Sequence, residues 1–198
     1  MPGYKYEGIA CQVYSASGSG RKALMRAFNN GNGDHFYTTD LSEHAAAINS
    51  GAYSDEHFAC WVLPPELEPG NIPQGVIPLM RAFHKGTGDH FYTTSSDELH
   101  NAISGGYTYE GNACFVPESE VLGTTTPFFR LYSNSNGDHF YTIYVAERDF
   151  ARAPSASSGG KPQLSVYYFC IQEKNFEIGI SVLCSNILSL HCYNAWFD

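Results

Sequence analysis

One short motif occurs three times in the chain, and this repetition constrains the fold more than any other feature. The motif is Gly-Asp-His-Phe-Tyr-Thr, and it spans residues 33–38, 88–93 and 137–142. Consecutive copies of its aspartate lie 55 and 49 residues apart, a spacing similar to that of tandem-repeat proteins. A chain of 198 residues has room for one domain made of three such units. The function should therefore be sought in something built three times, rather than in one catalytic centre.

The residues on both sides of the motif also repeat and predict the same local structure in each copy. An apolar strand that contains one arginine precedes the motif, and a Gly- and Asn-rich tetrapeptide between them predicts a tight hairpin. A capping residue and an acid three positions later follow in the first two copies, which predicts a capping box. These pairs are Asp40 with Glu43 and Ser95 with Glu98, whereas the third copy has Tyr144 at the cap position and keeps Glu147.

A short helix and a strand are expected to complete each unit. The helices are predicted over 41–49, 96–103 and 145–151, with left-handed glycines at Gly51, Gly105 and Gly159 to end them. The last strands are predicted over 53–62 and 107–116, and the units extend over about 24–63, 79–117 and 128–160. Pro-rich linkers separate them.

The N-terminal segment 3–14 resembles the last strand of a unit. Residues 3–11 match residues 106–114, with Gly-Tyr-x-Tyr-Glu-Gly-x-Ala-Cys in both. Two explanations remain open: this strand completes the third copy and closes a ring, or the chain is cut from a longer array. We expect a mainly β fold with short helices (α+β repeats), a single domain over 1–160 of three pseudo-symmetric units, closed into a trefoil-like or small propeller-like ring.

The repeat character disappears in residues 161–198, which hold half of the six cysteines. This divergent C-terminal tail has two explanations: it is not native repeat sequence, as translation of a non-coding segment would produce, or it is a divergent strand and tail.

Composition excludes some classes of partner. Aromatic residues make up 15% of the chain and charged residues 16%, which favours β structure. The net charge of −9 argues against nucleic acid and against an anionic membrane as partners. The N-terminus has no signal peptide, so we expect a cytoplasmic protein or a fragment of a secreted one. No nucleophile elbow, Walker loop or zinc-protease motif is present, so we expect no enzyme and no cofactor.

The extended pattern consists of Arg-x-[Phe/Tyr], then Gly-Asp-His-Phe-Tyr-Thr-Thr, a Glu and finally Gly-Tyr-x-Tyr-Glu-Gly-x-Ala. It resembles a repeat family of unknown function. Its members are fungal and bacterial proteins with tandem copies, some of them attached to hydrolases. The resemblance covers about residues 1–160, and it implies an accessory module that binds carbohydrate. The third copy departs from the pattern, because Ile143 replaces the second threonine and the last strand is missing.

Three residues of each motif are the candidate ligand-binding residues. They are Asp34, His35 and Tyr37; Asp89, His90 and Tyr92; and Asp138, His139 and Tyr141. Each aspartate either binds amides of its own turn or accepts hydrogen bonds from sugar hydroxyls. The adjacent histidine points to the opposite face of the strand, so the pair is not expected to serve one pocket. Three roles remain open for the histidines: a structural role, contact with a ligand, or binding of zinc where the three of them meet on a threefold axis. Zinc binding is the weakest of the three, because no repeat contains a second His or Cys at the spacing of a zinc ligand.

The other repeated residues have structural and functional readings too. Arg26, Arg81 and Arg130 are expected to pair with the aspartate of the same hairpin as a structural clamp, with ligand contact as the alternative. The aromatic residues serve the core or offer a platform for a sugar ring. Cys11, Cys60 and Cys114 occupy one repeat position, which predicts buried thiols rather than disulfides.

The leading hypothesis is a lectin-like protein that binds glycans without catalysis and gains affinity from several sites. The alternatives are a structural or protein-interaction repeat domain without a small-molecule ligand, and an accessory module of a hydrolase.

Overall fold

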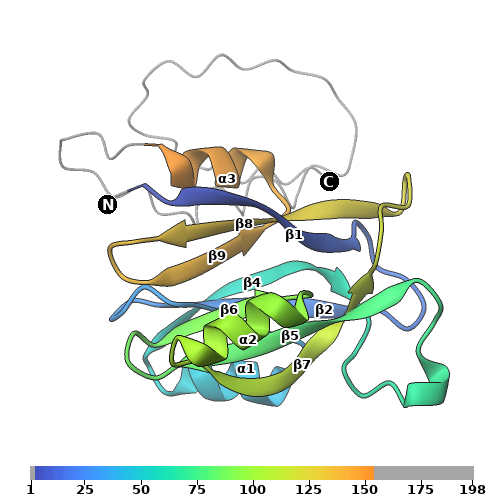
Figure 1. Ribbon diagram of the computed structural model, residues 1–198, viewed down its shortest axis with the longest axis horizontal. Coiled ribbons are helices and arrows are strands. Elements are labelled where there is room, and N and C mark those ends of the chain that lie inside the picture. The colour runs from blue at the N-terminus through green and yellow to red at the C-terminus, as the bar shows by residue number, and fades with distance from the viewer. Residues whose placement is uncertain (1–2, 154–198) are drawn as a thin grey trace, which may run out of the picture. The chain divides into compact units, whose positions relative to one another are not determined.

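The computed structural model describes residues 3–153, which form nine strands and three α-helices (Figure 1). The first unit consists of the hairpin β2 (Lys22–Asn29) and β3 (His35–Thr38), helix α1 (Leu41–Asn49) and strand β4 (Tyr53–Val62). Strand β2 is the centre of this unit, because β3 pairs with one of its edges and β4 with the other, both antiparallel.

The second and third units repeat this arrangement. The second contains β5 (Val76–His84), β6 (Asp89–Thr93), α2 (Ser96–Ser104) and β7 (Thr108–Pro117), and a short 3-10 turn at Pro69–Asn71 precedes it. The third contains β8 (Thr125–Ser133), β9 (Asp138–Thr142) and α3 (Val145–Arg152). The N-terminal strand β1 (Lys5–Tyr14) pairs antiparallel with β8 and takes the place that β4 and β7 have in the other units.

The strands form two sheets. One has six strands in the order β3-β2-β4-β1-β8-β9, and the other has three in the order β6-β5-β7. The junction between β1 and β4 in the larger sheet is short, with Tyr14 opposite Trp61. A single bridge between Leu63 and Phe115 connects the first unit to β7 of the smaller sheet. The prediction of a mainly β fold with short helices is confirmed.

The helices begin at the predicted capping residues, but the capping boxes are incomplete. The Asp40 carboxylate accepts bonds from the N–H groups of Ser42 and Glu43, and the Ser95 hydroxyl accepts one from the N–H of Glu98. In a capping box the acid would in turn accept a bond from the N–H of the cap residue. That N–H instead donates to a threonine hydroxyl in all three units, namely that of Thr38, Thr93 or Thr142. The acids are therefore available for other partners.

The helix ends agree with the prediction in one of the two described cases. Gly51 is left-handed with φ of 77°, as expected. Gly105 is not, because its φ is −83°; the left-handed residue after α2 is Gly106, with φ of 104°. Gly159 and the predicted tail 161–198 lie outside the described residues. Within residues 3–153, no helix has the length and apolar character that spanning a membrane requires.

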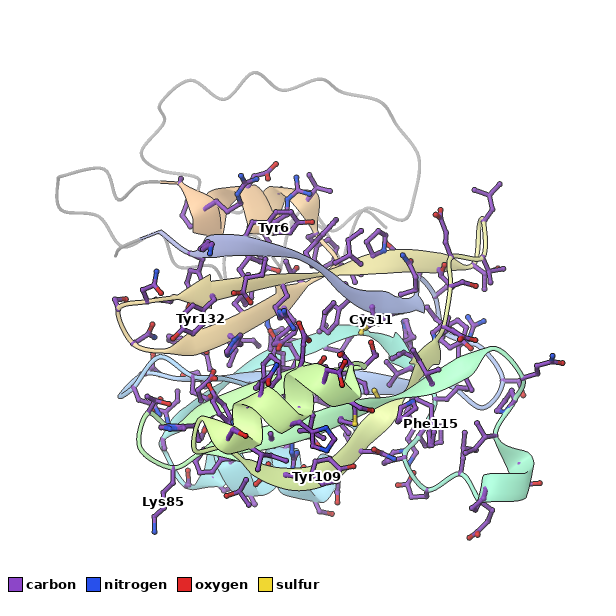
Figure 2. The ribbon with its side chains drawn as sticks, in the orientation of Figure 1. Tyr6, Cys11, Lys85, Tyr109, Phe115 and Tyr132 are labelled. Atoms are coloured by element: carbon purple, nitrogen blue, oxygen red, sulfur yellow. The ribbon has the colours of Figure 1, made fainter. Side chains whose placement is uncertain are left out.

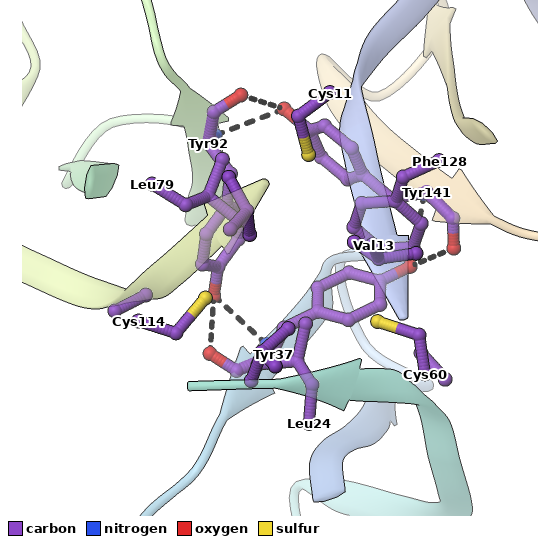
Figure 3. Packing of buried hydrophobic residues seen from close by; sticks show 14 residues of the cluster. Cys11, Val13, Leu24, Tyr37, Cys60, Leu79, Tyr92, Cys114, Phe128 and Tyr141 are labelled. Carbon is purple, nitrogen blue, oxygen red and sulfur yellow. Dashed lines mark hydrogen bonds between the residues drawn. The ribbon is translucent and has the colours of Figure 1, made fainter. Parts of the chain in front are cut away.

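The core draws on equivalent positions of the three units (Figure 3). Leu24, Leu79 and Phe128 from the central strands are fully buried, next to the motif tyrosines. The three repeated cysteines belong to the same cluster as free, buried thiols, so that prediction is confirmed. In contrast, Lys85 extends into solvent from the β5–β6 turn (Figure 2).

Candidate functional site

The nine candidate residues of the motifs lie inside the protein rather than on an open surface. Eight of them are buried, and His139 is nearly so. They lie in strands β3, β6 and β9, except Asp34, which directly precedes β3. Each of these strands contacts the other two units. Their contacts therefore show what the motif does within the fold.

Each motif aspartate binds the motif histidine of a different unit. Asp34 Oδ1 accepts the backbone N–H of His90 at 2.8 Å, and Asp34 Oδ2 lies 2.7 Å from His90 Nδ1. The Tyr53 hydroxyl donates to the same Oδ2 at 2.7 Å. The other two aspartates have equivalent partners: Asp89 binds His139 and Tyr107, and Asp138 binds His35 and Tyr4.

These contacts correct the expectation that the aspartate binds amides of its own turn. The amide that it binds belongs to the next unit, because the hairpins pack side by side with their motifs in contact. As predicted, adjacent Asp34 and His35 serve different partners. The aspartates, not the histidines, come together: one carboxylate oxygen of each lies within 4.8 Å of one from each other aspartate. Both oxygens of each carboxylate already accept hydrogen bonds from the protein, so we assign them to the contacts between units.

Burial and charge act in opposite directions on the His35–Asp138 pair. Burial of the His35 imidazole favours its neutral form, but the Asp138 carboxylate outweighs this effect and raises the pKa of His35. Burial of Asp138 would raise the pKa of its carboxyl, yet the charge and hydrogen bond of His35 lower it. Both shifts favour an ion pair.

The motif tyrosines form a second set of contacts between units (Figure 3). The Tyr92 hydroxyl donates to the Tyr37 carbonyl and accepts the Tyr37 N–H, both at 2.8 Å. Tyr141 binds the backbone of Tyr92 in the same way, and Tyr37 binds that of Tyr141. The rings meet edge to face, with centroids 5.4–5.6 Å apart. Burial raises the pKa of all three hydroxyls, which keeps them protonated as donors.

The repeated arginines pair with glutamates rather than with the expected aspartate of their own hairpin. Arg130 donates through both Nη atoms to Glu98 of the second unit, at 2.8 and 2.9 Å, and its Nε lies 3.0 Å from Glu7. Arg81 has the same arrangement with Glu43 and Glu110, and Arg26 has it with Glu147 and Glu56. The motif aspartates do not pair with the arginines, because each of them is already hydrogen-bonded to a histidine of another unit.

The capping-box acids thus act between units. Hydrogen bonds from the Arg130 guanidinium hold the pKa of the Glu98 carboxyl down at about 2. Burial of Glu43 would raise the pKa of its carboxyl, but hydrogen bonds from Arg81 and Thr38 lower it overall. Both glutamates are therefore charged at neutral pH and stabilise the guanidinium beside them.

A cavity of about 270 Å³ opens next to the Arg130 cluster. It lies between β1, the end of β6 and the start of α2. Its lining is mainly polar and consists of Glu7, Ile9, Ala10, Thr93, Thr94, Ser95, Glu98 and Arg130. This is slightly smaller than the range of about 300–1,000 Å³ that is usual for pockets of drug-sized ligands. The cavity can thus hold a small polar ligand against charged groups that the fold keeps in place.

The candidates derived from the sequence did not include the glutamates of this cluster. Glu7, Glu56 and Glu110 follow the tyrosine of the last strand at the same spacing in every copy. An arginine among apolar residues in the central strand needs anionic partners. The acids that repeat in register with this arginine were the signal in the sequence that pointed to these glutamates, although not to which unit supplies each one.

Comparison with known proteins places the chain in a family. No match to it was found among curated proteins or among solved structures. One family model matches residues 1–63 and 77–180, which is most of the chain. The chain therefore belongs to the family described as "Domain of unknown function (DUF5648)".

Proposed function

We propose that the chain is a non-catalytic carbohydrate-binding domain, in which the Gly-Asp-His-Phe-Tyr-Thr motif joins the units and sugars bind in clefts between them. The cavity beside Arg130 is the observation that carries this proposal. Its Glu7 and Glu98 carboxylates are held in fixed positions by the guanidinium, with threonine and serine hydroxyls close by. Fixed carboxylates and hydroxyls are suited to the hydroxyl groups of a sugar, because binding then requires little ordering of side chains.

The state of the Asp–His pairs supports a role without catalysis. A general base must reach the proton of a substrate within hydrogen-bonding distance. The Asp34 carboxylate is buried and already accepts bonds on both oxygens, and the Nδ1 atom of His90 faces it. The equivalent groups of the other two pairs are engaged in the same manner. These groups are suited to holding units together.

We also propose that the three units form a closed ring with pseudo-threefold symmetry. Two observations support this. Strand β1 completes the third unit by pairing with β8, and each kind of contact runs in one direction around the units. His90 binds Asp34 of the first unit, His139 binds Asp89 of the second, and His35 binds Asp138 of the third. The tyrosine and the arginine contacts follow the same order.

A broad glycan array, together with haemagglutination, tests the proposed function on folded protein. We expect binding of at least one neutral glycan and agglutination by a protein with more than one site. Negative results in both assays would overturn the proposal.

A structural or protein-interaction domain without a small ligand is the second candidate, favoured by the burial of the nine motif residues. An Asp89→Asn variant examines the role of the motif in either case. We expect a lower melting temperature, because the variant weakens the bonds to His139 and Tyr107. If the melting temperature stayed unchanged and glycan binding were lost, the motif would be a ligand site instead.

A further inference from the structure

We infer that the domain carries two sugar sites rather than three, at the first–second and second–third unit junctions, and that each takes a neutral sugar. The arginine cluster at the junction between the third and first units is nearly buried. This inference rests on the proposed function, and it adds the number of sites, their position and the class of sugar.

The three arginine clusters differ in exposure although their bonds are equivalent. In the second–third junction, 14% of the Arg130 side chain and 41% of the Glu98 side chain are exposed. In the first–second junction the corresponding values are 15% for Arg81 and 38% for Glu43. In the third–first junction they fall to 2% for Arg26 and 8% for Glu147. A ligand can therefore reach two clusters but not the third.

The nearly buried junction, called sealed below, also differs from the open ones in sequence. In each last strand, the residue two positions after the glutamate that contacts the arginine Nε differs between junctions. It is Ile9 at the second–third junction, Asn112 at the first–second junction and Phe58 at the third–first junction. Ile9 and Asn112 are exposed, whereas Phe58 is half-buried and packs against Trp61. On the opposite wall, Thr94 and Ser95 of the open junction correspond to Ile143 and Tyr144 of the sealed one. The nearly buried junction thus has larger and more apolar residues at positions that line the open one.

The hydrogen-bonding groups of the open clefts define the ligand. Arg130 places its Nε 3.0 Å from Glu7 and donates through both Nη atoms to Glu98, which engages three of its five N–H groups. Carboxylate oxygens, which only accept, line the cavity together with the hydroxyls of Thr93, Thr94 and Ser95, which both donate and accept. A ligand with several adjacent groups that donate and accept, such as the hydroxyls of a sugar, suits this lining.

Charge decides between classes of sugar. Each of the two exposed clusters contains one guanidinium and two carboxylates, and Asp40 adds a further negative charge near Glu43. A sugar that carries its own carboxylate would be repelled. The cavity of about 270 Å³ limits the occupant to a small ligand, such as one sugar ring. We therefore assign a neutral monosaccharide unit to this cavity and, because the Arg81 cluster has equivalent bonds and exposure, to the first–second junction as well.

The test measures how many sugar molecules bind per chain, before and after the open junctions are given the side chains of the sealed junction. The probes are methyl glycosides of glucose, galactose, mannose and N-acetylglucosamine, with glucuronate as the acidic comparison, titrated by calorimetry and ligand-observed NMR. Ile9→Phe with Thr94→Ile gives one open junction the side chains of the sealed one, and Asn112→Phe narrows the other. Leu122→Ser, at an exposed loop residue away from the clefts, is the matched control.

We expect two equivalents of one neutral glycoside per chain, one after either closure, and at least tenfold weaker binding after both. Glucuronate should not bind, and all variants should keep the melting temperature of the wild type within a few degrees. Binding with unchanged stoichiometry in the closed variants, or three equivalents in the wild type, would overturn the two-site inference and leave carbohydrate binding standing. Absence of binding by every probe and by the glycan array would overturn the proposed function and the inference with it.

A variant of the sealed junction gives an independent check. Phe58→Asn with Ile143→Thr gives it side chains found at the open junctions. We expect a third equivalent of sugar to bind. If the variant folds and the stoichiometry stays at two, these side chains are not what seals the junction.

Discussion

The tyrosine contacts between units predict a large loss of stability from removal of a single oxygen atom. In Tyr92→Phe the ring keeps its packing, but the hydroxyl that bonds both the N–H and the carbonyl of Tyr37 is lost. One lost hydrogen bond contributes about 1 kcal/mol, and a buried N–H without a partner costs about 1–3 kcal/mol more. We therefore expect the free energy of unfolding to fall by about 2–4 kcal/mol. This corresponds to a decrease of roughly 4–16 °C in melting temperature for a domain of this size.

Urea unfolding followed by circular dichroism measures this loss. Tyr109→Phe is the matched control, because the Tyr109 hydroxyl donates to Asn112 at the exposed surface. We expect that variant to change stability by less than about 0.5 kcal/mol. Tyr37→Phe and Tyr141→Phe should match Tyr92→Phe, since their hydroxyls make equivalent bonds. A Tyr92→Phe variant as stable as its control would refute the assignment of these hydroxyls to the contacts between units.

Three further predictions concern charge and backbone strain. Arg26→Met leaves two nearly buried glutamates without their cation, so the free energy of unfolding measured in urea should fall by about 3–5 kcal/mol. Arg81→Met, in a more exposed cluster, should lower it clearly less, and equal losses in the two variants would contradict the argument from burial. The contact between His35 and Asp138 raises the pKa of His35, so its contribution to stability is complete below pH 6.5 and is lost as pH rises through the raised pKa. The same contact lowers the pKa of Asp138, so its contribution is complete above pH 3.8 and is lost as pH falls through the lowered pKa. The difference in unfolding free energy between wild type and Asp138→Asn should therefore be largest between these values, and a difference that is greatest at pH 9 would be inconsistent with the ion pair. His57 has φ of 66° where the other units have glycine, a left-handed backbone conformation that strains a residue with a side chain. His57→Gly should therefore raise the free energy of unfolding by up to about 1 kcal/mol, and a decrease would show that the His57 side chain stabilises the protein by more than the backbone strain costs.

Local structure was predictable from the sequence because it depends on neighbouring residues. The helix over 41–49 and the strand over 53–62 have their predicted bounds, since capping residues and glycines act within a few positions. Pairing between units was not predictable in the same way. The rule that Arg26 needs an anionic partner was sound, but the nearest acid in the hairpin was the wrong one. Only the packing of hairpins reveals that Asp34 is taken by His90 and that Arg26 binds Glu147.

The candidate residues show the same limit. Their repetition marked them as essential, yet repetition does not distinguish a residue that binds a ligand from one that binds the next unit. The chemistry of Asp, His and Tyr suits both tasks. Burial separates them, and burial depends on contacts between residues about 50 or 100 positions apart, such as His90 with Asp34 and His35 with Asp138.

The pairing of β1 with β8 has a consequence for how the chain folds. More than a hundred residues separate Lys5 from Tyr132, its partner in the pairing, so β1 gains its main partner only after the first two units have been synthesised. Contacts between such distant segments slow folding, because a long loop must close before they form. On the ribosome, the first two units contain all of their own strands, whereas β1 must wait with its hydrogen-bonding edge exposed. Such an edge can pair with the wrong strand, including β8 of another chain, which makes exchange of β1 between molecules the expected route to misassembly.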